Sequence, residues 1–239
     1  MSHIKVGLVS YKFINNNIKF NISQIKKAIT LSKGSVDMLC FGETFLQGFD
    51  SLNWHYENDK DIAITQLSET MELLKALSLE NKIDFLFGYI ERDGGYLYSS
   101  CAVIVNGEIM HNYRRITKNW KEYKITDEHY KEGDTVKSFF YKGKEITLTL
   151  CGDLWIYPEK FRTKGIVIWP VYVNFSIDEW QTQQYEYAKQ SLLASTDVLM
   201  INSISENPDS HGGAFYFKNG TIKQKLDFRQ EGILIVELS

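Results

Sequence analysis

Residues 146–155 read ITLTLCGDLW and determine how the rest of the chain is interpreted. Ile, Thr and Leu lead up to the cysteine, as they do in a strand buried within a sheet. Gly152 and Asp153 then break the run, and Pro158 is suited to the first turn of a short helix. The pattern predicts that Cys151 lies where a strand turns sharply toward a helix, whose N-terminus can stabilise a thiolate.

A cysteine at a strand end also has a plainer interpretation, because free cysteine is among the residue types most often buried as small hydrophobes. The chain has three cysteines, Cys40, Cys101 and Cys151, which lie far apart. They form no CxxC pair and no Cys/His cluster, so the sequence predicts neither a metal site nor a disulfide framework.

Composition narrows the class of protein. A length of 239 residues suits one large layered domain over residues 1–239, and a hydrophobic content of 44% is enough for a real core. The net charge is −3 and no long basic run occurs, which argues against nucleic acid as the main partner. No apolar run is long enough to span a membrane, and the N-terminus lacks the form of a signal peptide. We therefore expect a cytoplasmic protein.

Apolar spacing predicts an α/β (α+β) fold in which helices cover layered sheets. The predicted helices and strands alternate in the first third of the chain, and hairpins dominate afterwards. Strands are predicted at 4–10, 36–41, 83–91, 96–105, 108–115, 136–141, 145–151, 165–169 (ended by Pro170) and 198–201, followed by a meander over 214–238; helices are predicted at 18–32, 61–81 and 178–195.

Three reactive side chains follow predicted strands. Glu43 comes directly after the apolar strand 36–41, Cys151 ends another strand, and the strand between them ends in the basic run 114–118. Strand ends can converge at one rim of a sheet. A thiol needs a base before it can attack a carbonyl carbon, and a fixed cation can hold the oxyanion that develops.

These motifs resemble the nitrilase, or carbon–nitrogen hydrolase, superfamily along nearly the whole chain. The resemblance rests mainly on FGETFLQGF at 41–49, YRR at 113–115 and CGDLW at 151–155. It implies an α-β-β-α sandwich, a Glu-Lys-Cys triad, no metal or cofactor and a homodimer. It also implies a small-molecule amide or nitrile as substrate.

The chain departs from the family pattern at two of these positions. Gly42 stands where members usually have proline, and Arg115 stands where the catalytic lysine usually follows the tyrosine–arginine pair. Lys118 and Lys121 lie close behind. Among these cations we favour Lys118, because an ammonium can both stabilise charge and exchange a proton, whereas a guanidinium stays charged. Arg115 and Lys121 remain the alternatives.

Further site residues are expected in the loop 117–134 and after the nucleophile. Either Glu122 or Glu128 fits the second acid that family members often carry. Trp155 is close enough to Cys151 in sequence to form a pocket wall.

We interpret the chain as a cysteine-dependent hydrolase of a small non-peptide C–N bond, acting through a thioester and on amides rather than nitriles. In this interpretation Glu43 is the base, Cys151 the nucleophile and Lys118 the cation. The alternative is a non-catalytic member of the superfamily that binds a small metabolite or a partner protein, since the lysine is missing from its usual place.

Overall fold

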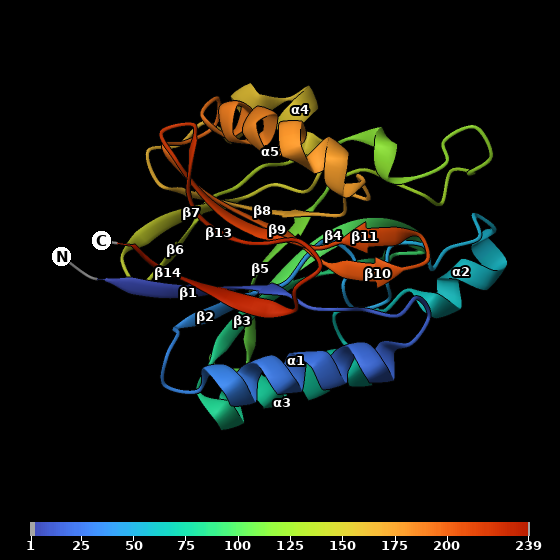
Figure 1. The fold of residues 1–239 in the computed structure, drawn as a ribbon. Helices are drawn as coiled ribbons and strands as arrows, with labels where there is room; N and C mark the ends of the chain where they lie inside the picture. Colours follow the sequence, from blue (N-terminus) through green and yellow to red (C-terminus); the bar gives the residue numbers. More distant parts are fainter. Residues whose placement is uncertain (1–2, 239) are drawn as a thin grey trace.

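The fold is seen in a computed structural model that describes residues 3–238; residues 1, 2 and 239 of the predicted domain lie outside the described part. Within residues 3–238, two six-stranded sheets pack face to face, and helices cover the outer side of each (Figure 1). This arrangement is the four-layer α-β-β-α sandwich predicted from the sequence. No helix in this range is long and apolar enough to cross a membrane.

The first sheet carries two helices on its outer face. Its strand order is β14-β1-β2-β3-β4-β5, with β14 antiparallel to β1 and β2 parallel to both of its neighbours. Helices α1 and α3 cover this sheet on the lower side of Figure 1, and α2 lies at the margin. The bounds are β1 Ile4–Ser10, α1 Ile18–Ser32, β2 Met38–Cys40, α2 Tyr56–Ile62, α3 Glu69–Asn81, β3 Asp84–Asp93, β4 Tyr96–Val105, β5 Glu108–Arg114 and β14 Gly232–Leu238.

The second sheet has the order β13-β12-β9-β8-β7-β6, and helices α4 and α5 cover its outer face (Figure 1). A small hairpin of β10 and β11 lies apart from both large sheets. The bounds are β6 Phe139–Tyr141, β7 Lys144–Leu148, α4 Asp153–Ile156, β8 Ile166–Val171, α5 Ile177–Ser191, β9 Asp197–Asn202, β10 Ile204–Glu206, β11 Asp209–His211, β12 Ala214–Lys218 and β13 Thr221–Leu226, with 3-10 turns η1 at Lys118–Trp120 and η2 at Pro158–Phe161.

The largest core cluster lies between the sheets, where inward-facing side chains of both interdigitate. Leu8 of β1 and Leu148 of β7 belong to it and are fully buried. Burying one such side chain contributes about 1.5–3 kcal/mol relative to leaving it exposed. Cys40 and Cys101 are buried in the same cluster, so their thiols are packing groups. The apolar inner face of each sheet is therefore what joins the two halves of the molecule.

Three sequence predictions differ from the structure. The helix expected over 61–81 begins only at Glu69, because Ser68 caps it through a hydrogen bond from Met71 N at 3.3 Å. Residue Ile64 instead bridges to Glu91, and the separate helix α2 precedes it. The Ser68 cap therefore sets the start of α3, whereas the apolar spacing alone predicts a helix that begins eight residues earlier, at residue 61.

Pro170 does not end its strand. Pairing of β8 with β7 stops at Ile168, but pairing with β9 continues through Pro170 to Val171. Proline lacks a backbone N–H, so Pro170 interrupts the pairing of β8 only with the strand that would have accepted a hydrogen bond from that N–H.

The prediction of one C-terminal meander over 214–238 is also wrong in part. Strands β12 and β13 form the expected hairpin in the second sheet, but β14 crosses to the first sheet and pairs with β1 from Ile4↔Leu238 to Ser10↔Gly232. The last strand therefore ties the two sheets together.

A glycine in β3 brings the first sheet against the segment that carries Glu43. A β-carbon at Gly88 would lie 2.3 Å from Thr44 N and 2.7 Å from the α-carbon of Glu43. The same glycine donates its N–H to Gly42 O at 3.1 Å, and its carbonyl accepts from Leu46 N at 3.1 Å. No side chain fits there, because the neighbouring atoms are backbone.

We expect Gly88→Ala to lower the free energy of unfolding by about 3 kcal/mol, since the added methyl overpacks against backbone that cannot rotate away. Gly34→Ala is the control: its β-carbon meets nothing within 4 Å, and its φ of +76° should cost only about 1 kcal/mol. Urea unfolding of both variants measures the difference. Equal losses would contradict the close approach at Gly88.

Candidate active site

A buried ion pair stands at the ends of β2 and β5. Arg115 Nη1 donates to Glu43 Oε1 at 2.7 Å, and the two side chains are 1% and 0% exposed. Ser99 Oγ of β4 donates to the same oxygen at 3.3 Å. Glu43 Oε2 has no hydrogen-bond partner among residues 3–238, although it is buried. One carboxylate oxygen is therefore committed to the cation, and the other is available to accept a proton.

Cys151 lies at the predicted sharp turn between β7 and α4. Its φ is +39°, a conformation that costs a non-glycine residue about 1–3 kcal/mol and is found where a surrounding structure enforces it. Strand β8 and its extension supply that restraint: Cys151 N donates to Pro170 O at 3.0 Å, and Trp169 Nε1 donates to Cys151 O at 2.9 Å. The Cys151 thiol faces Tyr172 O at 3.7 Å.

The thiol of Cys151 keeps its proton at neutral pH. Desolvation and then the negative charge of Glu43 raise its pKa to about 12, and the positive charge of Arg115 acts in the opposite direction. The expectation that a helix N-terminus stabilises a thiolate is therefore wrong for the resting protein, since α4 has only four residues. A base must take the proton before this sulphur can attack.

Arg115 is anchored through all three of its nitrogens. Besides Glu43, Nε donates to Thr117 Oγ1 at 2.9 Å and Nη2 donates to Asn119 Oδ1. Burial opposes the charge, but Glu43 and the neighbouring acidic groups raise the pKa of the guanidinium above its usual value. The cation is fixed in position and permanently charged.

Asp153 joins the turn of the second sheet to the end of β5 in the first. It is fully buried, and its carboxylate accepts from Tyr113 OH at 2.6 Å, from Thr117 N at 2.9 Å and from Leu150 N at 3.3 Å. Burial raises the pKa of this carboxyl, against the charge of Arg115 and these hydrogen bonds. Asp153 thereby links the segment that carries Arg115 to the turn that carries Cys151.

The structure places the other predicted residues away from the Glu43 carboxylate. Lys118 is exposed in η1; its carbonyl accepts from Lys121 N at 3.4 Å, but its ammonium makes no hydrogen bond or ion pair within the described range 3–238. Lys121 pairs instead with Glu132 at 2.7 Å. Glu122 and Glu128 are both exposed on the loop after η1. The chain after Arg115 therefore turns outward at Thr117, and the loop does not carry Lys118 back to Glu43.

Trp155 lies on α4, 38% exposed, with its ring centroid 5.0 Å from that of Tyr187 on α5. Tyr187 was not predicted as a site residue. Burial and then the charge of Cys151 raise the pKa of its hydroxyl. Trp155 and Tyr187 thus form an aromatic wall beside the turn.

Four polar contacts around the pair were also missed: Ser99, Thr117, Asn119 and Asp153. The sequence held one usable signal, because a charged Asp153 directly after a buried strand needs buried partners. Ser99 meets Glu43 across 56 residues, which no local pattern marks, whereas Thr117 and Asn119 lie only two and four residues after Arg115.

The Gly42 departure has a steric reason. A β-carbon at this position would lie 2.3 Å from Ser203 Oγ, in the segment that follows β9. The second sheet therefore occupies the space that a proline ring would need.

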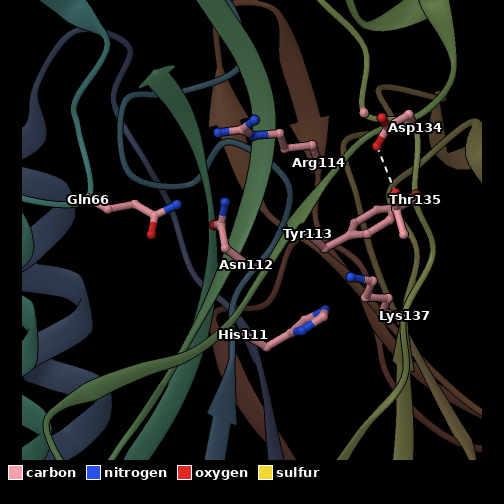
Figure 2. Close-up of a pocket in the computed structure, with 9 residues that line it drawn as sticks. Gln66, His111, Asn112, Tyr113, Arg114, Asp134, Thr135 and Lys137 are labelled. Atoms are coloured by element: carbon pink, nitrogen blue, oxygen red, sulfur yellow. Dashed lines mark hydrogen bonds between the residues drawn. The ribbon is translucent and has the colours of Figure 1, made fainter. Parts of the chain in front are cut away.

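A cavity of about 290 Å³ lies against β5. Its charged lining residues are Arg114, Asp134 and Lys137, none of which belongs to the Glu43–Arg115 pair. Figure 2 shows Asn112 and Arg114 directed toward Gln66, with Tyr113 on the side of Thr135 and Lys137. Gln66, Asn112 and Arg114 all donate to the buried carboxylate of Glu91, Arg114 with two nitrogens at 2.8 and 2.9 Å. This cluster is internally satisfied and fixes β5 on β3.

Within residues 3–238, no group of three or more His, Cys, Asp or Glu side chains is arranged to hold a metal ion. The site brings together a carboxylate, a guanidinium and a thiol. Together they can deprotonate a nucleophile and stabilise an oxyanion.

Comparison with known proteins gives a family. The family described as "Carbon-nitrogen hydrolase" matches residues 5–239. An (R)-stereoselective amidase from Pseudomonas sp. is 24% identical over 159 residues, which cover 63% of this chain and 52% of the amidase. A glutamine-dependent NAD(+) synthetase from Thermotoga maritima is 25% identical over 162 residues, covering 65% of this chain and 26% of the synthetase. The matches thus span about half or less of these curated relatives.

A solved structure has the same fold. The CN-hydrolase superfamily protein from Xanthomonas campestris, which carries an arsenic adduct in its active site, superposes with a TM-score of 0.80 at 16% identity, over 100% of this chain and 91% of that chain.

The raised pKa of Cys151 predicts an unusual alkylation profile. An ordinary thiol has a pKa of about 8.5, so its reaction with iodoacetamide levels off soon above that pH. A pKa of about 12 means that the rate of Cys151 alkylation should keep rising between pH 9 and 11. Glu43→Gln should shift the profile to lower pH, because it removes a negative charge. Mass spectrometry, with Cys151→Ala as the blank, measures the rates; a plateau below pH 9 would contradict the assignment.

Proposed function

Since the chain belongs to the carbon–nitrogen hydrolase family, we propose that it hydrolyses a small non-peptide amide through a thioester on Cys151. In this proposal Glu43 is the general base and Arg115 is the cation that holds the oxyanion. The observation that carries the proposal is the buried Glu43–Arg115 pair at 2.7 Å, whose charges act on the Cys151 thiol.

The first half of the reaction forms the thioester. Glu43 Oε2 takes the thiol proton, and the sulphur adds to the carbonyl carbon, whose oxygen becomes an anion held by the guanidinium of Arg115. The C–N bond then breaks, and the proton on Glu43 passes to the leaving nitrogen, so that ammonia or an amine departs. The high pKa of the thiol supports this order, because the sulphur holds its proton until a base such as Glu43 takes it.

The second half reuses the same carboxylate. Glu43 takes a proton from water, the hydroxide adds to the thioester carbon, and Arg115 again holds the oxyanion. The C–S bond breaks, the proton returns to sulphur, and a carboxylic acid leaves. Arg115 cannot exchange protons, because a guanidinium stays charged. Both proton transfers therefore fall to Glu43, whose Oε2 has no other partner among residues 3–238.

Two features support an amide substrate rather than a nitrile. One relative is an amidase, and the other is a synthetase that depends on glutamine, itself a carboxamide.

A cytoplasmic setting is in keeping with three free cysteines. The family resemblance implies a homodimer. Sedimentation across micromolar concentrations measures the oligomeric state, and a monomer at every concentration would refute the homodimer.

Cys151 should be the one thiol that turnover requires. Cys151→Ala should abolish ammonia release from a panel of ω-amides, while Cys101→Ala should retain it and lose only stability, because Cys101 is buried in the core. Ammonia assays and thermal melts of both variants measure this. Full activity in Cys151→Ala would refute the mechanism. A wild-type protein inactive on the whole panel would favour the non-catalytic binding alternative.

The cation is tested by comparing Arg115 with Lys118. Arg115→Ala should lower kcat by about 10²–10³, the usual cost of losing an oxyanion donor. Lys118→Ala should leave kcat nearly unchanged, because within residues 3–238 it is Arg115 and not the Lys118 ammonium that contacts Glu43.

Arg115→Ala also leaves the Glu43 carboxylate buried without its cation, which destabilises by about 3–5 kcal/mol. Arg115→Lys is therefore the matched variant: it keeps the charge and should recover folding and part of kcat. A loss of kcat in Lys118→Ala with none in Arg115→Lys would reverse the assignment of the cation.

A further inference from the structure

The side chain of Asn119 lies flat across the glycine that follows the nucleophile. A β-carbon at Gly152 would lie 2.7 Å from Asn119 Nδ2, 2.8 Å from Asn119 Oδ1 and 2.8 Å from Arg115 Nη2. With these contacts, a side chain at position 152 would require the Asn119 carboxamide or the Arg115 guanidinium to move. The absence of a side chain at Gly152 therefore makes room for the Asn119 carboxamide beside Cys151.

The orientation of this carboxamide follows from its partner. Arg115 Nη2 can only donate, so the group facing it must be the amide oxygen, as the hydrogen bond to Oδ1 shows. The Nδ2 end, with two N–H donors, then points elsewhere. Within residues 3–238 it has no hydrogen-bond partner. A donor therefore remains free next to the Cys151–Gly152 turn.

This donor can be reached from outside. Asn119 is exposed, in contrast to the buried Arg115 beside it. It also lines a cavity of about 280 Å³ between the residues that follow Arg115 and those that follow the nucleophile, together with Lys118, Tyr123 and Tyr157. The cavity places Asn119 in reach of a small molecule, and the 2.7 Å from Asn119 Nδ2 to a β-carbon at Gly152 places the same side chain against the residue that directly follows Cys151.

We propose that Asn119 is a further catalytic residue, whose Nδ2 donates to the carbonyl oxygen of the scissile amide and continues to do so as that oxygen becomes an anion. This inference rests on the proposed function. Arg115 and Asn119 would then act as a unit: the guanidinium polarises the carboxamide through its oxygen, and both donate to the same developing charge.

The simpler role for Asn119 would be to position Arg115, and two substitutions separate these roles. Asn119→Asp keeps an oxygen for Arg115 but replaces the Nδ2 donor with an acceptor. Asn119→Ala removes both groups. If Nδ2 donates to substrate, both variants should lower kcat by about 10²–10³, the range for one oxyanion donor. Asn219→Asp, in the exposed turn after β12, controls for the added charge.

Each outcome decides the point. Loss in both variants, with Cys151 alkylation and thermal melting unchanged, supports the donor role. Retention of kcat in Asn119→Asp overturns it, because Asn119 then only positions Arg115. Loss in Asn119→Asp alone also overturns it, since that loss would come from the added charge. If the wild-type protein releases no ammonia from any amide, the proposed function fails and this inference falls with it; an active wild type separates the two.

Discussion

The buried contact between Glu43 and Arg115 is the constraint on which the rest of the site depends. Both charges are removed from water, which costs several kcal/mol for each ion unless hydrogen bonds replace the lost solvent. Arg115 obtains that replacement from Thr117 and Asn119, and Glu43 obtains part of it from Ser99. The pair is thus stable only where several strand ends bring these groups together.

The frame around the pair is built from both sheets. Glu43, Ser99 and Arg115 belong to the first sheet, whereas Cys151 follows a strand of the second. Asp153 connects them, because its carboxylate accepts from Tyr113 OH and Thr117 N while its own backbone directly follows the nucleophile turn. The apolar core between the sheets holds the halves together, and Asp153 sets their register at the reactive end.

An arginine at this position changes how the chemistry is divided. A lysine ammonium can donate to an oxyanion and also exchange a proton, whereas the guanidinium only donates. In exchange it offers three directed nitrogens, which here contact Glu43, Thr117 and Asn119 at once. The guanidinium therefore contacts more neighbours at once than a lysine ammonium could. In the mechanism that we propose, proton transfer is left to Glu43, and the Cys151 thiol, whose pKa is raised to about 12, is activated by that carboxylate.

Local pattern was enough to predict the strands of the two large sheets, helices α1, α3 and α5 and the placement of Glu43 and Cys151 after strands, but not the hairpin of β10 and β11 or helix α2. The apolar run before Glu43 and the ITLTL run before Cys151 each end at a break that a short window of sequence displays. Strand β1 and helix α1 have the predicted bounds, because a period of two or 3.6 residues is a local property.

What the sequence by itself determined was therefore the layered fold and the acid and thiol at strand ends. Alternation along β5 could also align Arg115 with Tyr113, but it could not decide between Arg115 and Lys118, because that depends on the path of the loop after β5. The tertiary structure shows which of the two contacts Glu43: Arg115 does, at 2.7 Å, and Asp153 binds Thr117 across 36 residues of sequence, just before the exposed Lys118. Contacts at such separations, like that of Asn119 with Gly152, follow from how two sheets pack, which no local pattern encodes.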